Sequence, residues 1–385
     1  MRKATANLTA QNGSQAALPD ADGKLPACQD KPADYPPTHT GDFGLSEATL
    51  RLTNGENLTR AEAAKFLENL ISPDAKDAQI ADALTALAAK GETVDELAGM
   101  AEAMRNRALR LHSRHRNFID TAGTGSSSAK TFNVSTAAGF VIAGAGLPVA
   151  KHGARAATSN CGSADVLEAL GVNTAASPQT VERCLNDHGV CFMFAPLFHR
   201  ATARVAQVRR QLAVRTTFNL LGPLTNPARA PFQLVGVWDA AWVERVASAL
   251  ALLGIEHAWV VHGSDGLDEL TIAGETRVAS CSARAGVKAF TISPQEFGLE
   301  RQSLDASRAD GPDENAQLIR AILSGANKSE LGPARDLVLI NAAAALYLAG
   351  IAPDPRHAAN LARESIESGH AASKLDALIR ETNRR

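Results

Sequence analysis

The sequence has no uninterrupted apolar run long enough to cross a lipid bilayer. Its most apolar stretch, residues 137–150, is short and is broken by three glycines and a proline. The N-terminus carries Arg2 and Lys3, but the apolar segment that a secretory signal requires does not follow them. We therefore expect a cytoplasmic location and no membrane partner.

The sequence also lacks a strong excess of charge and a regular cysteine framework. Its formal net charge is −2, so no basic field favours nucleic acid or an anionic membrane as partner. The five cysteines form no Cys-x-x-Cys pair, and their odd number fits reduced thiols in a cytoplasm. The chain does have length and apolar content. Its 385 residues, 45% of them hydrophobic, are enough to bury a large core in one or two domains.

The first 45 residues differ in composition from the rest. They contain five prolines and few aliphatic side chains, so they cannot bury enough apolar surface to offset the entropy lost on ordering. We expect a disordered N-terminal extension over residues 1–45, and a partner-binding arm is the alternative.

Helical signals follow this extension. Thr59 and Glu62 have the spacing of a capping box and precede an apolar stripe. Apolar residues at helical spacing also predict helices from about 77 to 90 and from about 93 to 104. These segments predict a small all-α domain.

The rest of the chain reads as α/β. Strands are expected at 118–121, 149–150, 233–237 and 257–262, with helical stretches between them at 242–253, 314–323 and 337–347. Alternation of this kind favours a sheet with a substantial parallel part and helices on both faces.

Two segments in this region have the composition of anion-binding loops. The first covers residues 123–131 and continues through Asn133, Ser135 and Thr136; the second covers 151–163. Glycine lets backbone N–H groups approach an anion closely, and hydroxyls and a helix N-terminus add donors. Tight turns between strand and helix are the alternative for either segment alone. Two such segments in succession predict an enzyme whose ligand has two phosphate-like ends.

These motifs resemble the anthranilate phosphoribosyltransferase family, in which a GTGGD loop and an NxST segment precede KHGNR and GSADxLEALG. The corresponding letters here are GTGSS at 123–127, NVST at 133–136, KHGAR at 151–155 and GSADVLEALG at 162–171. Further matches are FAP at 194–196, RTTFNLLGPLTNP at 215–227 and GLDEL at 266–270. The resemblance extends from about Leu58 to near the C-terminus.

The resemblance implies a nucleoside-phosphorylase/phosphoribosyltransferase-like fold of two domains. Residues 46–112 and 177–213 would form the small helical domain. Residues 113–176 and 214–385 would form a large α/β domain with a mixed or largely parallel sheet flanked by helices. The implied reaction transfers the phosphoribosyl group of phosphoribosyl pyrophosphate (PRPP) to the amine of anthranilate and releases pyrophosphate, a step of tryptophan biosynthesis. A homodimer joined through the helical domains is also implied.

Phosphoribosyl transfer requires mainly positioning and electrostatic stabilisation, so no single catalytic residue is assigned. By resemblance, the PRPP site comprises Gly123, Ser126, Ser127, Thr131, Asn133, Ser135, Thr136, Lys151, Arg155, Ser159 and Ser163. The acceptor, an aromatic amine, would contact Gly123, His152, Ala154 and Arg209. Mg²⁺ would be bound by Ser135, Asp268 and Glu269.

The residue types suit these roles. Lys151 is a point charge suited to phosphate, and Arg155 has the fork of a bidentate clamp. The Arg209 guanidinium matches a carboxylate through two parallel bonds, whereas Arg210 is expected to face solvent. Adjacent acids such as Asp268 and Glu269 usually mark a solvated helix start, but a divalent cation here would relieve their mutual repulsion.

Two places depart from the family pattern. Ser126 and Ser127 replace a glycine and an aspartate, and Lys130 replaces an asparagine, which makes the first segment more positive. Ala154 replaces an asparagine that contacts the acceptor in the family. A buried acceptor group left without that partner would cost about 1–3 kcal/mol.

These departures keep other functions open. A paralogue that transfers phosphoribose to another aromatic or heterocyclic nitrogen is one alternative. A non-enzymatic relative that binds nucleic acid is another, but the near-neutral charge and the Asp268-Glu269 pair argue against it. A pyrimidine nucleoside phosphorylase, which shares the architecture by family relation, is a third.

Overall fold

The computed structural model describes residues 43–125, 127–129, 131–156, 161–212, 214–325 and 331–384. The expected N-terminal extension lies outside these residues except for 43–45, and Leu45 already belongs to the first helix. Within the described ranges, no helix is long and apolar enough to span a membrane.

Four helices open the described chain: α1 (Leu45–Thr53), α2 (Arg60–Leu70), α3 (Asp77–Lys90) and α4 (Val94–Arg107). The capping box predicted at Thr59 and Glu62 is present, and Thr93 with Glu96 forms a second one at α4. Helices α2 and α4 pack closely at Gly99, where a Cβ would lie 2.1 Å from the Arg60 carbonyl oxygen. The helices expected in this region are confirmed.

Strands and helices alternate through the rest of the chain. In order they are β1 (Ile119–Asp120), α5 (Val134–Gly144), β2 (Val149–Gly153), α6 (Ser163–Ala169), α7 (Pro178–Arg183), the π-helix η1 (Cys184–His188), β3 (Val190–Phe194), α8 (Ala195–Phe198), the 3₁₀ helix η2 (Arg200–Thr202), α9 (Ala203–Leu212), α10 (Thr217–Leu224), β4 (Phe232–Gly236), η3 (Ala240–Trp242), α11 (Val243–Leu252), β5 (His257–Gly263), β6 (Thr276–Ser282), β7 (Gly286–Ile292), η4 (Pro294–Phe297), η5 (Asp305–Ser307), α12 (Gly311–Leu323), α13 (Gly332–Leu348), α14 (Pro355–Glu367) and α15 (His370–Thr382).

The strands form one mixed sheet in the order β3-β2-β1-β4-β5-β6-β7. Neighbours from β3 to β5 are parallel, and β6 and β7 add an antiparallel edge. The largely parallel sheet flanked by helices is therefore confirmed. Because parallel strands end at the same edge, the loops that follow β1, β2, β4 and β5 are brought together there.

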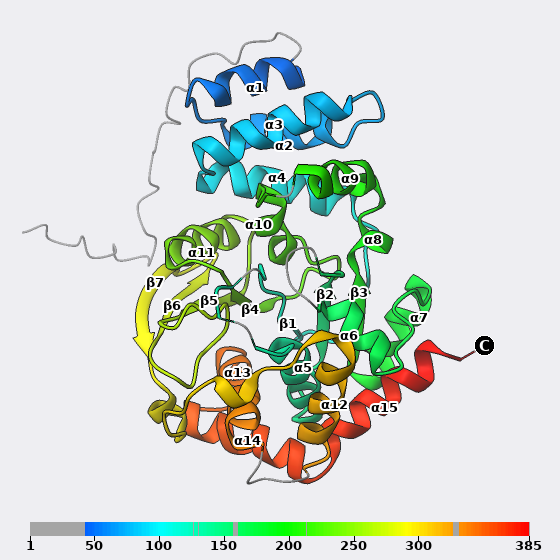
Figure 1. Ribbon diagram of the computed structural model, residues 1–385, viewed down its shortest axis with the longest axis vertical. Coiled ribbons are helices and arrows are strands. Elements are labelled where there is room, and N and C mark those ends of the chain that lie inside the picture. The colour runs from blue at the N-terminus through cyan, green and yellow to red at the C-terminus, as the bar shows by residue number, and fades with distance from the viewer. Residues whose placement is uncertain are drawn as a thin grey trace, which may run out of the picture. The chain divides into compact units, whose positions relative to one another are not determined.

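The sheet has a different hydrophobic core on each of its faces, because successive side chains of a strand point to opposite sides. On β5, Trp259 and Val261 pack in the core with α5 and helices α12–α15, whereas Ala258 and Val260 pack with α10, α11 and the N-terminal helices. Figure 1 shows these two sets of helices on opposite sides of the strands.

The segment 177–213 contains one element that packs with the N-terminal helices and another that packs with the α/β region. Helix α9 packs against α3, but α7 packs against β3 and α15. Part of this segment, which was expected to be helical with the small domain, is instead a strand, because the buried apolar run Val190–Phe194 pairs with β2 as the edge strand β3. A short apolar run of this kind has no periodicity that separates strand from helix. The division of the chain into two domains at these boundaries stays a prediction.

Candidate active site

The loops that follow β1 and β5 lie against each other at the carboxyl edge of the sheet. A Cβ on Gly123 would lie 3.2 Å from the Gly236 carbonyl oxygen and 3.5 Å from Asp268 Oδ2. Ser128 Oγ donates to the Gly266 carbonyl oxygen at 3.3 Å. The first predicted phosphate segment therefore contacts the loop that carries the acid pair.

Lys151 is the buried cation at the centre of this edge. Its Nζ donates to the carbonyl oxygen and to Oγ1 of Thr121, at 3.2 and 3.3 Å, and to Ser135 Oγ at 3.3 Å. The Ser135 N–H in turn donates to Glu269 Oε1 at 2.9 Å. Side chains from β2, the first turn of α5 and the loop after β5 thus meet at one point.

The ionisable groups here have shifted pKa values because they are buried. Desolvation lowers the pKa of Lys151. It raises the pKa of Glu269 well above its ordinary value, and the charge of Asp268 raises it further. Desolvation also raises the pKa of Asp268, while bonds from the Ser127 hydroxyl and the Gly125 N–H oppose that rise. A cation at the acid pair would favour the charged form of both carboxyls.

Asp120, at the end of β1, is a second buried carboxyl beside Lys151. It is fully buried, and its oxygens accept from the His152 N–H at 3.1 Å and from Asn226 Nδ2 at 2.7 Å. Asn226 also donates to the Ala150 carbonyl oxygen at 2.9 Å. Burial raises the pKa of Asp120, and the neighbouring Lys151 ammonium opposes that rise. These contacts fix β1, β2 and the loop after α10 relative to one another.

The remaining residues of the first segment lie just before α5 and in its first turn. The Asn133 N–H donates to Asn315 Oδ1 at 2.9 Å, and Asn133 Nδ2 donates to the Cys161 carbonyl oxygen at 3.3 Å. Thr131 Oγ1 donates to the Phe132 carbonyl oxygen at 3.3 Å. Thr136 Oγ1 is buried and has no hydrogen-bond partner among the described residues.

The second segment is only partly described, and its arginine is already paired. Arg155 bonds Asp165 at 2.9 Å and Glu168 at 2.7 Å, both on α6. Ser163 Oγ donates to the carbonyl oxygen of Ala154, whose own side chain is exposed. A phosphate at Arg155 would therefore compete with two carboxylates. Ser126 in the first segment and Ser159 in the second lie outside the described residues.

Two buried histidine rings lie side by side near α10. The centroids of His152 and His199 are 5.0 Å apart, and neither Nε2 has a partner within the described chain. Burial lowers the pKa of His152 to about 4 and that of His199 to about 3, so both rings are neutral at pH 7. His152 Nδ1 lies 3.1 Å from the Gly222 carbonyl oxygen, an acceptor, so Nδ1 carries the proton and Nε2 presents a lone pair.

Arg209 reaches the same helix from α9. Its Nη2 donates to Asn219 Oδ1 at 3.0 Å, and its guanidinium carbon lies 5.3 Å from the centre of the Phe218 ring. Nε is buried and has no partner in the described part of the chain, and burial lowers the Arg209 pKa to about 10. Arg210 is exposed, as expected. Helix α10 therefore joins the two predicted acceptor residues His152 and Arg209.

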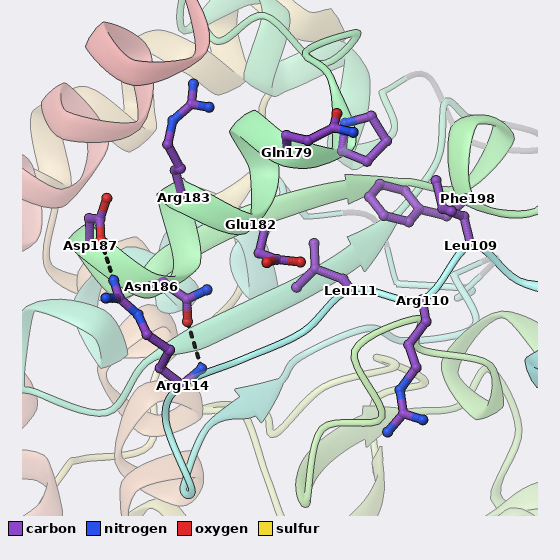
Figure 2. A pocket seen from close by; sticks show the side chains of 11 residues that line it. Leu109, Arg110, Leu111, Arg114, Gln179, Glu182, Arg183, Asn186, Asp187 and Phe198 are labelled. Carbon is purple, nitrogen blue, oxygen red and sulfur yellow. Dashed lines mark hydrogen bonds and ion pairs between the residues drawn. The ribbon is translucent and has the colours of Figure 1, made fainter.

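A surface cavity of 620 Å³ lies elsewhere, between the chain that leads into β1 and helix α7 (Figure 2). Part of its polar lining is engaged internally, since the Arg114 N–H donates to Asn186 Oδ1 at 2.7 Å and the Arg114 side chain pairs with Asp187. The His112 N–H likewise donates to Glu182 at 3.1 Å. None of the predicted site residues lines this cavity.

Comparison with known proteins gives one consistent result. A glycosyl transferase family helical bundle domain matches residues 46–108, and a glycosyl transferase family a/b domain matches residues 115–372. Anthranilate phosphoribosyltransferase of Moorella thermoacetica is 50% identical over 86% of this chain and 96% of its own length. The chain belongs to the anthranilate phosphoribosyltransferase family. Membership confirms the resemblance drawn from the motifs and identifies the chain as a pentosyltransferase.

Solved structures of the family agree with the fold. The Thermus thermophilus enzyme is similar with a TM-score of 0.81 and 42% identity, covering 87% of this chain and 99% of that one. The Saccharomyces cerevisiae enzyme in complex with PRPP and Mg has a TM-score of 0.80 and 28% identity, covering 89% of this chain and 98% of that one. The family's two-part fold is thus confirmed for this chain.

Sequence reasoning missed several residues that the structure brings to this edge of the sheet. They are Asp120, His199, Asn226 and Asn315. Two of them, His199 and Asn226, lie in or beside motifs that match the family. The motifs indicate that these segments matter for the site, but not which residues the two side chains contact. Asp120 lies within the strand predicted at 118–121, and nothing in the local sequence marks Asn315.

Proposed function

We propose that this chain transfers the phosphoribosyl group of PRPP to the amine of anthranilate and releases pyrophosphate, a step of tryptophan biosynthesis. The observation that carries the proposal is the convergence of Lys151, Ser135 and the Asp268-Glu269 pair at the carboxyl edge of the parallel strands. A buried ammonium beside an acid pair suits a highly charged leaving group that needs a cation. The 50% identity to the Moorella thermoacetica enzyme supports the same substrates.

PRPP is proposed to bind along the two segments, at Gly123, Ser126, Ser127, Thr131, Asn133, Ser135, Thr136, Lys151, Arg155, Ser159 and Ser163. The buried Thr136 hydroxyl, which has no partner among the described residues, and the Lys151 ammonium are apt donors to phosphate oxygens. The Ser127 hydroxyl already bonds Asp268, so its proposed role includes orienting that carboxylate.

Mg²⁺ is the proposed cofactor, held by Asp268, Glu269 and Ser135. The donors are hard oxygens, as Mg²⁺ prefers, and burial disfavours leaving both carboxylates charged without a cation. Among the described residues, no group of three or more His, Cys, Asp or Glu could hold a metal ion. This fits an ion that is bound by a few protein oxygens together with substrate phosphates. When bound, Mg²⁺ supplies positive charge that stabilises the departing pyrophosphate.

The acceptor is proposed to lie against α10, with Gly123 and Ala154 beside it. Arg209 would bind the anthranilate carboxylate with Nε, which has no partner among the described residues, as one of the two donors of its fork. The neutral His152 and His199 rings would accept hydrogen bonds from the amine, which directs its nitrogen lone pair toward C1 of the ribose. The new C–N bond then forms as the C1–pyrophosphate bond breaks.

The metal site is tested by the combined substitution of Asp268→Asn and Glu269→Gln. We expect Mg²⁺-dependent pyrophosphate release to fall at least a hundredfold, or roughly 3 kcal/mol of transition-state stabilisation, with the circular dichroism spectrum unchanged. The exposed Glu275→Gln is the matched control and should keep wild-type activity. Equal turnover in the double variant and the control would remove this pair from the site.

A homodimer and a cytoplasmic location are proposed as well. The N-terminal helices are amphipathic, and Leu50 on α1 is 62% exposed, which suits a partner on this surface. Light scattering should give the mass of two chains, and replacing Leu50 with Asp should shift it toward one. A single-chain mass for the unaltered protein would overturn the dimer.

A further inference from the structure

Asn315, in the first turns of α12, is a buried amide that makes three hydrogen bonds. It is 2% exposed; its Oδ1 accepts from the Asn133 N–H at 2.9 Å. Its Nδ2 donates to the carbonyl oxygens of Ala309 at 3.2 Å and of Gly311 at 2.6 Å. A buried amide bonded on both sides has one favourable orientation, so it fixes the backbone at Asn133 relative to α12.

Asn341, in the middle of α13, binds a second loop in a similar way. It is 3% exposed, and its Oδ1 accepts from the Leu270 N–H at 3.0 Å. Its Nδ2 donates to the carbonyl oxygens of Leu270 and Leu337, each at 2.9 Å. Both backbone polar groups of Leu270 are therefore held by one side chain.

These two amides support the same contact from opposite sides. Asn133 lies two residues before Ser135, and Leu270 directly follows Glu269. The Ser135 N–H and Glu269 Oε1 are 2.9 Å apart and join the two loops. Helices α12 and α13 both pack against α5, so the frame that carries the amides is continuous with the helix that carries Ser135.

We propose that Asn315 and Asn341 are positioning residues that hold the PRPP segment and the acid pair in register across the Ser135–Glu269 contact. The inference rests on the proposed function of those two loops. Asn315 sets the backbone that receives PRPP, and Asn341 sets the carboxylate that receives Mg²⁺. Neither amide touches a reacting atom.

Kinetics separate the two roles. Asn315→Ala should raise KM for PRPP about tenfold, and Asn341→Ala should raise the Mg²⁺ concentration for half-maximal rate about tenfold. Both should leave KM for anthranilate within about twofold of wild type. The double variant should lose less than the product of the two single losses, because both act on one contact.

The matched control perturbs the other end of α5. Ser365 is buried, and its Oγ donates to the Val141 carbonyl oxygen at 2.8 Å. Ser365→Ala should lower the melting temperature and leave KM for PRPP and the Mg²⁺ requirement unchanged. Asparagine variants whose kinetic constants match this control would overturn the proposal.

A conservative variant adds a pH signature. In Asn315→Asp the acceptor oxygen remains, but the second oxygen faces two carbonyls and needs a proton to bond one of them. The ratio of its kcat/KM for PRPP to that of wild type should therefore rise severalfold as the pH falls from 8 to 5.5. A ratio that is independent of pH contradicts the assigned hydrogen bonds.

A ligand-free measurement distinguishes failure of this inference from failure of the proposed function. Hydrogen exchange at the Ser135 amide should be about tenfold faster in Asn315→Ala and Asn341→Ala than in Ser365→Ala. If the wild type releases no pyrophosphate from PRPP while this difference is seen, the amides position the loops and the proposed function fails. Equal exchange in all three variants overturns the positioning role whatever the activity.

Discussion

Arg209→Ala tests the acceptor site, because it should weaken the use of anthranilate with little effect on the stability of the fold. Within the described residues, the Arg209 guanidinium donates to Asn219, and its buried Nε has no partner. This Nε is one of the donors proposed to bind the anthranilate carboxylate. Removal of the side chain should therefore weaken acceptor use and spare PRPP use.

The size of the effect follows from the kind of bond. A charge-assisted, bidentate pair contributes about 1.5–3 kcal/mol, which corresponds to a fall of roughly 10- to 150-fold in kcat/KM for anthranilate. Arg209→Lys keeps the charge but loses the fork, so a smaller loss is expected. Because burial disfavours the free cation and lowers its pKa to about 10, loss of the guanidinium should not lower the free energy of unfolding by more than about 1 kcal/mol.

The assay is pyrophosphate release at saturating PRPP with anthranilate varied, then with the two substrates exchanged. KM for PRPP should stay within about twofold of wild type. Arg210→Ala is the matched control, because the neighbouring side chain on the same helix is exposed. If Arg209→Ala and Arg210→Ala give the same anthranilate kinetics, or if PRPP use suffers equally, the carboxylate assignment is refuted.

Three further results are expected. Burial lowers the pKa of His199 to about 3, so below about pH 6.5 this histidine gains a proton in the unfolded chain but not in the folded protein, and the free energy of unfolding falls. His199→Asn should make the free energy of unfolding, measured in urea, depend less steeply on pH by about 1.4 kcal/mol per pH unit. An unchanged slope would contradict the neutral ring. Gly236→Ala should lower the melting temperature, since its Cβ would lie 1.4 Å from the Asp268 carbonyl oxygen, whereas Gly139→Ala should not; equal melting temperatures would refute that close approach. Ala154→Asn should raise kcat/KM for anthranilate up to about tenfold. A kcat/KM below that of the wild type would show that other residues recognise the acceptor.

The sequence predicted the loops of the site better than the contacts within them. Glycine-rich and hydroxyl-rich segments next to predicted strands indicated phosphate binding, because that chemistry is local. The meeting of Lys151, Ser135 and Glu269 depends on the order of strands in the sheet, which no short motif encodes. The pairing of Arg155 with two acids of α6 was missed because a clamp for phosphate and a surface ion pair use the same residue type.

The secondary-structure predictions also succeeded where the signal in the sequence is local and clear, and failed elsewhere. The strands expected near 118, 149, 233 and 257 and the helices of the N-terminal region are confirmed, since their apolar patterns are clear. Strand β3 was missed because its five residues continue an apolar stretch between helices. Strands β6 and β7 were not anticipated, and β7 is largely exposed, so it lacks the apolar signal of a core strand.

The most direct test measures turnover and its stoichiometry with PRPP, Mg²⁺ and a panel of aromatic amines and nitrogen heterocycles. We predict that anthranilate leads the panel, that one pyrophosphate is released for each anthranilate consumed, and that chelation of Mg²⁺ stops both. Turnover with another acceptor while anthranilate stays inert would contradict the substrate assignment. No turnover with any acceptor, together with no binding of PRPP, would contradict the account of the site itself.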